Sequence, residues 1–335
     1  MNEDQVSNRP ESVWVLVGLT SIAMSTLVVE VALTKFFAYK IYHHFTYAVL
    51  SLVILGFGAA GVFVYLRSSV FGPDSWANVA KYGVYYAVTL MVSLLIFCWT
   101  PLDPYNDSFS PWLRSLSLPF YFILFTIPFF FAGVCVCYTL AQSKRPVPHI
   151  YFWDLLAAAV GVALCPLLMK TVGGYGTFLL AAGGGMVTFL SFHRASGRSL
   201  TGGVLPWVVF AAVGAVLLWY PAFSVERYGF DIRSSKDRWH RVPFIQDFTG
   251  IESTYWNAIA RIDVSYTGVS RDPTYLGGLA AKAYTLDIPG RYILQDGGAN
   301  TRQFKVTGPI EKQHYLGGSL WASPYVIYPD ARRSM

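Results

Sequence analysis

The chain contains seven runs of apolar residues, each about as long as a helix needs to cross a lipid bilayer. The hydrocarbon core of a bilayer is about 30 Å thick, and an α-helix needs about 20 apolar residues to span it. Only 13% of the 335 residues are charged, against about 25% in soluble domains. We therefore predict an α-helical polytopic membrane protein with about seven spans. The runs cover residues 13–37, 46–66, 82–100, 117–141, 151–170, 174–193 and 204–220.

The composition changes after residue 220. Residues 221–335 hold 14 Lys and Arg and 11 Asp and Glu, against 11 and 8 in the residues before them. No later run is long enough to cross a bilayer. We therefore divide the chain into an N-terminal tail (1–12), a transmembrane helical domain (13–220) and a polar, β-rich tail (221–335).

The polar tail carries the pattern of β-strands. In "NAIARIDVSY" apolar and polar residues alternate with a period of two, which indicates a strand with one buried face. The apolar set would form that face: Ala260, Ile262, Val264 and Tyr266. We expect "ESTYWNAIARIDVSY" and "RYILQDGGANTRQFKV" to form an antiparallel sheet. Its open face would be covered by a partner protein, by a second copy in an oligomer, or by residues 311–325.

Basic residues are distributed unevenly between the loops. The loops on the side of the N-terminus carry Arg9, Arg67, Lys81, Lys144, Arg145, Arg194 and Arg198, and those on the other side carry Lys35, Lys40, Arg114 and Lys170. Loops rich in Lys and Arg stay in the cytoplasm, so this count favours a cytoplasmic N-terminus and an extracytoplasmic tail. We expect a bacterial inner-membrane protein in contact with anionic lipid, without a nucleic-acid partner.

Three glycines, Gly56, Gly58 and Gly61, match the spacing of a dinucleotide-binding loop. Such a loop follows a strand and opens a helix, whereas these glycines lie inside the apolar run 46–66. We interpret them as helix-packing positions, because small residues let neighbouring membrane helices approach closely. No cysteine or histidine spacing predicts a metal site.

Two acidic residues, Glu30 and Asp154, lie inside apolar runs. Acids in membrane spans are costly, usually face the protein interior, and pair with another group. We interpret both as members of a structural polar contact between helices. Glu30 would have a partner on another helix, and that partner could be Asp154. Two alternatives are a path for a proton or a small cation and a misplaced span edge.

The membrane segments resemble those of membrane-bound spermidine synthase-like proteins. "EVALTKFFAYKIYHHFTYAVLSLVILGFGAAGVFVYL" is similar to the first two spans of that family, and "YFWDLLAAAVGVALCPLL" is similar to a later one. In the tail, "YWNAIARIDV" resembles a family strand. "ILQDGGANT" resembles the turn that carries Leu-Asp-Gly-x-x-Gln in soluble spermidine synthases, with Asp296 and Gly297 matched and Asn300 in place of the glutamine. An Asp-Gly pair between strands is equally typical of an ordinary hairpin turn.

The resemblance implies a membrane domain and β-hairpins that precede a nucleotide-binding catalytic domain. This sequence reaches "PDARRSM" without a Gly-rich loop, so we expect no cofactor, no catalytic residues and no enzymatic activity of the chain alone. The leading hypothesis is a non-catalytic or split member of the family that anchors or docks a partner subunit. The alternatives are an accessory or scaffold subunit of a larger membrane complex and a transporter of a small, polyamine-like cation.

Overall fold

A computed structural model describes residues 12–41, 43–67, 75–100, 109–197, 251–257, 259–265, 268–270, 288–296 and 299–304, together with a few single residues that include Phe71 and Leu102. These residues fall into two compact units, which are considered separately. The first holds the long helices and the turn Tyr255–Arg261, and the second holds most of the β-strands. Residues 221–250 and 305–335 of the expected tail lie outside the described residues.

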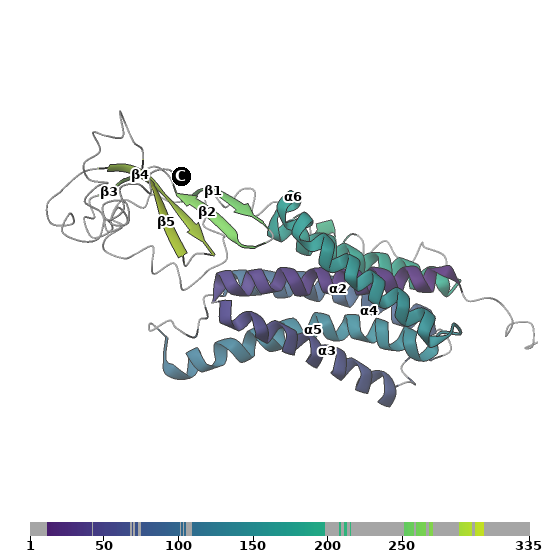
Figure 1. Cartoon of the computed structure of the whole chain (residues 1–335). Helices are drawn as coiled ribbons and strands as arrows, with labels where there is room; N and C mark the ends of the chain where they lie inside the picture. The colour runs from purple at the N-terminus through teal and green to yellow at the C-terminus, as the bar shows by residue number, and fades with distance from the viewer. Residues whose placement is uncertain are drawn as a thin grey trace, which may run out of the picture. The chain divides into compact units, whose positions relative to one another are not determined.

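Five long apolar helices in the described residues could span a membrane. They run alongside one another (Figure 1). They are α2 (Val13–Lys40), α3 (Thr46–Leu66), which follows the short 3-10 helix η1 (His43–Phe45), α4 (Ser75–Trp99), α5 (Pro111–Gln142) and α6 (Val147–Ala195). The first six apolar runs of the sequence each lie in one of these helices, and the fifth and sixth share α6. The seventh run, 204–220, lies outside the described residues apart from a few single positions.

Helix α6 consists of two halves that run in opposite directions along α2. The break is at Gly173, whose φ of 75° and ψ of 176° are not helical. Before the break, Gly161 packs on the backbone of Met24 and the Cys165 thiol lies 3.4 Å from the Val28 carbonyl oxygen. These pairs advance together along both helices, so this half of α6 is parallel to α2.

After the break the order is reversed. A Cβ at Gly174 would lie 2.7 Å from the ring of Phe36, and the hydroxyl of Thr188, farther along α6, donates to the carbonyl oxygen of Gly18 at 3.0 Å. The second half of α6 therefore runs antiparallel to α2. A positive φ is accessible to glycine without steric cost, which explains why the reversal falls at Gly173.

Small and hydroxyl-bearing residues hold α2 against the second half of α6. The hydroxyl of Ser21 donates to the Gly184 carbonyl oxygen at 2.9 Å, and the hydroxyl of Ser25 donates to the Ala181 carbonyl oxygen. The Ser25 hydroxyl also lies 2.7 Å from that of Tyr86 on α4. Interhelical hydrogen bonds and close backbone approach are the forces that associate helices in lipid, where water cannot drive them together.

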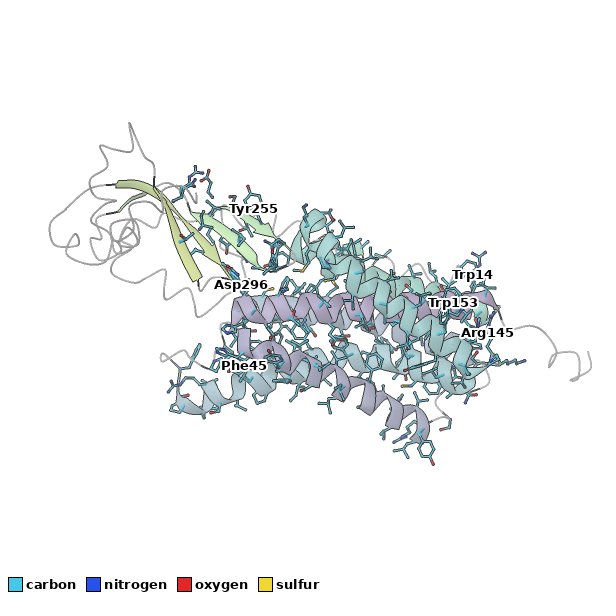
Figure 2. All side chains as sticks on the ribbon, in the orientation of Figure 1. Trp14, Phe45, Arg145, Trp153, Tyr255 and Asp296 are labelled. Carbon is cyan, nitrogen blue, oxygen red and sulfur yellow. The ribbon has the colours of Figure 1, made fainter. Side chains whose placement is uncertain are left out.

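The length of the helices fits a bilayer. Tyr47 and Tyr65, near the two ends of α3, are 83% and 84% exposed. Eighteen residues separate them, which corresponds to about 27 Å along a helix, close to the ~30 Å hydrocarbon thickness. Figure 2 shows Trp14, Trp153 and Arg145 at one end of the helices and Phe45 toward the other. Aromatic residues at both ends are typical of the two membrane interfaces.

The second unit is a small antiparallel sheet. Its strands are β1 (Ile251–Trp256), β2 (Arg261–Ser265), β3 (Gly268–Ser270), β4 (Ile288–Gln295) and β5 (Ala299–Phe304). Their order is β1-β2-β4-β3, and β5 also pairs with β4. One edge of β4 pairs with β2 and β3 and the other with β5, all antiparallel. The expected antiparallel sheet in the tail is therefore present.

The three glycines of the apolar run 46–66 have different surroundings. A Cβ at Gly56 would lie 2.8 Å from the Phe129 Cβ and 3.0 Å from the Thr126 carbonyl oxygen on α5. A Cβ at Gly61 would be 3.8 Å from the sulfur of Cys137, and one at Gly58 would have nothing within 4 Å. Only Gly56 is in tight contact with a neighbouring helix.

We predict that Gly56→Ala lowers stability by about 1–3 kcal/mol, because the added methyl meets the backbone of α5 and forces the helices apart. Gly58→Ala is the matched control, and it should be neutral or slightly stabilising, since alanine is the better helix former. Thermal unfolding of both variants in the same detergent gives the comparison. Equal unfolding temperatures for the two variants would contradict the packing described here.

Candidate functional site

A cluster of polar and aromatic contacts lies where the turn Tyr255–Arg261 meets the last turns of α2. The turn is closed by Asn257, whose side-chain oxygen accepts hydrogen bonds from the backbone N–H groups of Ile259 and Ala260, both at 2.7 Å. The Asn257 N–H donates to the Ala260 carbonyl oxygen at 3.1 Å. Asn side chains that bond backbone groups two or three residues ahead are common in tight turns, so the turn has a defined shape.

An aromatic stack holds the turn against α2. The rings of Trp256 and Phe36 are stacked, with centroids 4.9 Å apart and planes inclined by 15°. Phe36 is fully buried and also meets the rings of Tyr175 and Phe178 edge-on. The Trp256 ring fits in this position because residue 174 is glycine. A Cβ at residue 174 would lie 3.0 Å from the Trp256 ring. The reversal of α6 therefore forms part of the site.

Two cations complete the junction. Arg261 is only 1% exposed, and its guanidinium carbon lies 4.1 Å from the centroid of the Tyr39 ring and 5.6 Å from that of Trp256. The ammonium of Lys35 donates to the Ile259 carbonyl oxygen at 2.9 Å. A buried cation is costly unless aromatic faces or hydrogen-bond acceptors surround it. The position of Arg261 therefore depends on the rings of Tyr39 and Trp256.

The burial of this strand differs from the expectation. Ala260 is buried as expected for the apolar set, but Arg261 and Asp263 are each also only 1% exposed, whereas Ile262 and Val264 are half-buried. Arg261 packs on aromatic rings, and Asp263 accepts a hydrogen bond from the Thr254 hydroxyl at 2.7 Å. The expectation that polar residues of this strand face outward is therefore wrong. Tyr266 lies outside the described residues.

Glu30 and Asp154 do not meet. Gly161 lies beside Met24 and Cys165 beside Val28, which places Asp154 level with residue 17 of α2. Glu30 is thirteen residues farther along, or about 20 Å at 1.5 Å per residue. Both acids are half-buried, and no hydrogen bond or ion pair joins either to another described residue. This separation does not favour a single proton or cation path lined by both carboxylates. A partner for Glu30 on another helix stays a prediction.

The three tail residues matched to the family turn lie at the end of the β4–β5 hairpin. Asp296 follows β4 and has a φ of 49°, a left-handed conformation that Asp adopts more readily than most residues. Asn300 lies in β5 opposite Leu294 of β4. Gly297 lies outside the described residues. This arrangement is that of a hairpin, and the described residues contain no group of His, Cys, Asp and Glu that could hold a metal ion.

Comparisons with protein-family models, with curated proteins and with solved structures found no match. The central residues of the junction, Tyr39, Trp256 and Arg261, were not predicted as a site from the sequence. The sequence does contain one signal: Arg261 stands directly after a turn and at the start of a strand that was expected to have a buried face.

We predict that Trp256→Ala loosens the turn by about 2 kcal/mol, because the stack on Phe36 is lost. Hydrogen exchange of the backbone amides of 257–261 should then be roughly 30-fold faster, since 1.4 kcal/mol corresponds to a factor of ten. Tyr255→Ala is the matched control, because Tyr255 is adjacent but 61% exposed. Equal exchange in both variants would show that the stack does not hold the turn.

Proposed function

We propose that this chain is a membrane anchor that holds a β-rich tail at one face of the membrane and docks a partner protein there. The observation that carries the proposal is the junction at the end of α2. A stacked tryptophan, a buried arginine and a lysine–carbonyl hydrogen bond fasten the turn 255–261 to the helices. We expect such contacts in a protein whose membrane helices hold the start of an attached domain.

The resemblance to spermidine synthase-like membrane proteins is consistent with this role. Two of the segments on which it is based, residues 30–39 and 255–264, contribute the two sides of the junction through Phe36 and Trp256. In our proposal the docked partner is a nucleotide-binding, aminopropyltransferase-like domain. We propose no catalytic or cofactor-binding residue in this chain.

We further propose that the chain crosses the membrane seven times. The second half of α6 ends beside the start of α2, where the Arg194 guanidinium lies 5.0 Å from the Trp14 ring. The turn 255–261 contacts the opposite end of α2, at Lys35. These two contacts support a further crossing between residues 196 and 254, and in our proposal it is made by the apolar run 204–220, whose length suits a span.

The orientation of the proposed topology follows from the basic residues. Of the four on the side opposite the N-terminus, Lys35 binds the Ile259 carbonyl and Lys40 is buried at the end of α4. Arg114 lies near the start of α5 and Lys170 lies in α6. The count of seven basic residues against four in the sequence is what favours a cytoplasmic N-terminus. We propose a cytoplasmic N-terminus and an extracytoplasmic tail.

Labelling of single cysteines in intact cells tests this topology. Arg67→Cys and Tyr255→Cys place exposed thiols at opposite ends of the helices, and the native cysteines are buried or half-buried. A maleimide that cannot cross membranes should label residue 255 from outside and residue 67 only after lysis. Labelling of both positions from the same side would contradict a seven-span topology.

Purification from native membranes tests the docking role. A tagged wild-type chain should retain a partner in a fixed stoichiometry, and identification by mass spectrometry should show a nucleotide-binding domain. Arg261→Gln should lose most of that partner, since it frees the turn, whereas Tyr255→Ala should keep it. Equal retention by wild type and Arg261→Gln would contradict docking that depends on the turn 255–261. A partner of unrelated class retained only by the wild type would point instead to a scaffold subunit.

A further inference from the structure

The end of α4 contains a second buried cation, which the anchoring role does not use. Lys40, the last residue of α2, is 1% exposed. Its ammonium donates to the carbonyl oxygens of Phe97 and Thr100, the latter at 2.7 Å. It also lies 4.7 Å from the centroid of the Phe97 ring and 5.2 Å from that of the Tyr121 ring. The ammonium is therefore surrounded by two carbonyls and two aromatic faces.

The sequence explains why these two carbonyls accept from a side chain. In a continuing helix, the carbonyl of residue 97 would accept from the N–H of residue 101, and that of residue 100 from residue 104. Both of these residues are proline, which has no N–H to donate. The two carbonyls are consequently left for another donor, at the helix terminus where the dipole favours a positive charge.

The walls of this pocket are built independently of Lys40. The hydroxyl of Tyr121 donates to the Leu102 and Thr100 carbonyl oxygens at 2.9 and 3.2 Å. The Phe97 ring is stacked on Phe37 at 5.1 Å and meets Tyr121 edge-on at 5.0 Å. Phe37, Phe97 and Tyr121 come from three different helices, and all are buried. The walls can therefore keep their shape when the lysine side chain is shortened.

We propose that this pocket, formed by the Phe97 and Thr100 carbonyls and the rings of Phe97 and Tyr121, is a binding site for a primary alkylammonium, in which the side chain of Lys40 is the built-in occupant. Primary ammonium has three N–H donors and a compact charge, which suit two carbonyls and flanking aromatic faces. In the wild type the unbranched stem of Lys40 is buried together with its ammonium, so an unbranched alkyl stem matches the space that Lys40 occupies. The proposal stands independently of the anchoring role.

Chemical rescue of Lys40→Ala tests the proposal. This substitution removes three methylene groups and the ammonium, so n-propylammonium is the matching probe. The variant should unfold at a lower temperature than the wild type, and propylammonium should raise its unfolding temperature in a saturable manner, as a ligand bound to the folded state does. The wild type should not respond. Lys35→Ala is the control, because Lys35 makes a single carbonyl contact outside any such pocket.

Two further additives distinguish binding in the pocket from general effects of an additive on protein stability. Propan-1-ol has a similar size without the charge, and tert-butylammonium has the charge with a branched stem, so neither should rescue Lys40→Ala. If the variant does not survive purification, propylammonium is included from extraction onward and the folded yield becomes the readout. Rescue by propan-1-ol to the same extent, or no rescue by propylammonium in either format, would overturn the proposal.

Discussion

The close approach of α2 to both halves of α6 is the contact on which the rest of the structure depends. The first half passes Met24 at Gly161, and the second returns with Thr188 bonded to the Gly18 carbonyl. The reversal at Gly173 makes this possible and, through Gly174, also leaves room for Trp256 beside Phe36. Helix packing and attachment of the turn are therefore consequences of one feature, since a larger residue at position 174 would disturb both.

Three buried or partly buried cations are held by carbonyl groups or by aromatic rings. Lys40 binds two carbonyls at the end of α4 that prolines in the following sequence cannot satisfy. Lys35 donates to a carbonyl of the turn, and the Arg261 guanidinium lies over the rings of Tyr39 and Trp256. Each group thereby regains in protein contacts part of what it loses by leaving water. In this protein, these three basic residues hold helix ends and the turn 255–261 together.

The helical part of the fold could be predicted from the sequence, because a bilayer imposes a length and an apolar composition on every span. The break between runs 151–170 and 174–193 could be predicted from the lengths of the two apolar runs. The strand segments of the tail could be predicted from local alternation of apolar and polar residues. The partners of individual side chains were not. The separation of Glu30 from Asp154 depends on the axial register of two helices, which span lengths do not set. Burial of Arg261 depends in part on the ring of Tyr39, which is 222 residues earlier in the chain, and an alternating pattern does not reveal such a partner.

The central claim is that the turn 255–261 is fixed to the end of the helices, and pulsed electron paramagnetic resonance in lipid nanodiscs tests it most directly. Spin labels at positions 47 and 255 would replace two exposed tyrosines of the first unit. We expect a single narrow distance distribution for this pair, broadened when Trp256→Ala is introduced. A broad distribution in the otherwise unaltered protein would show that the turn is not held by the helices and would contradict the anchoring role.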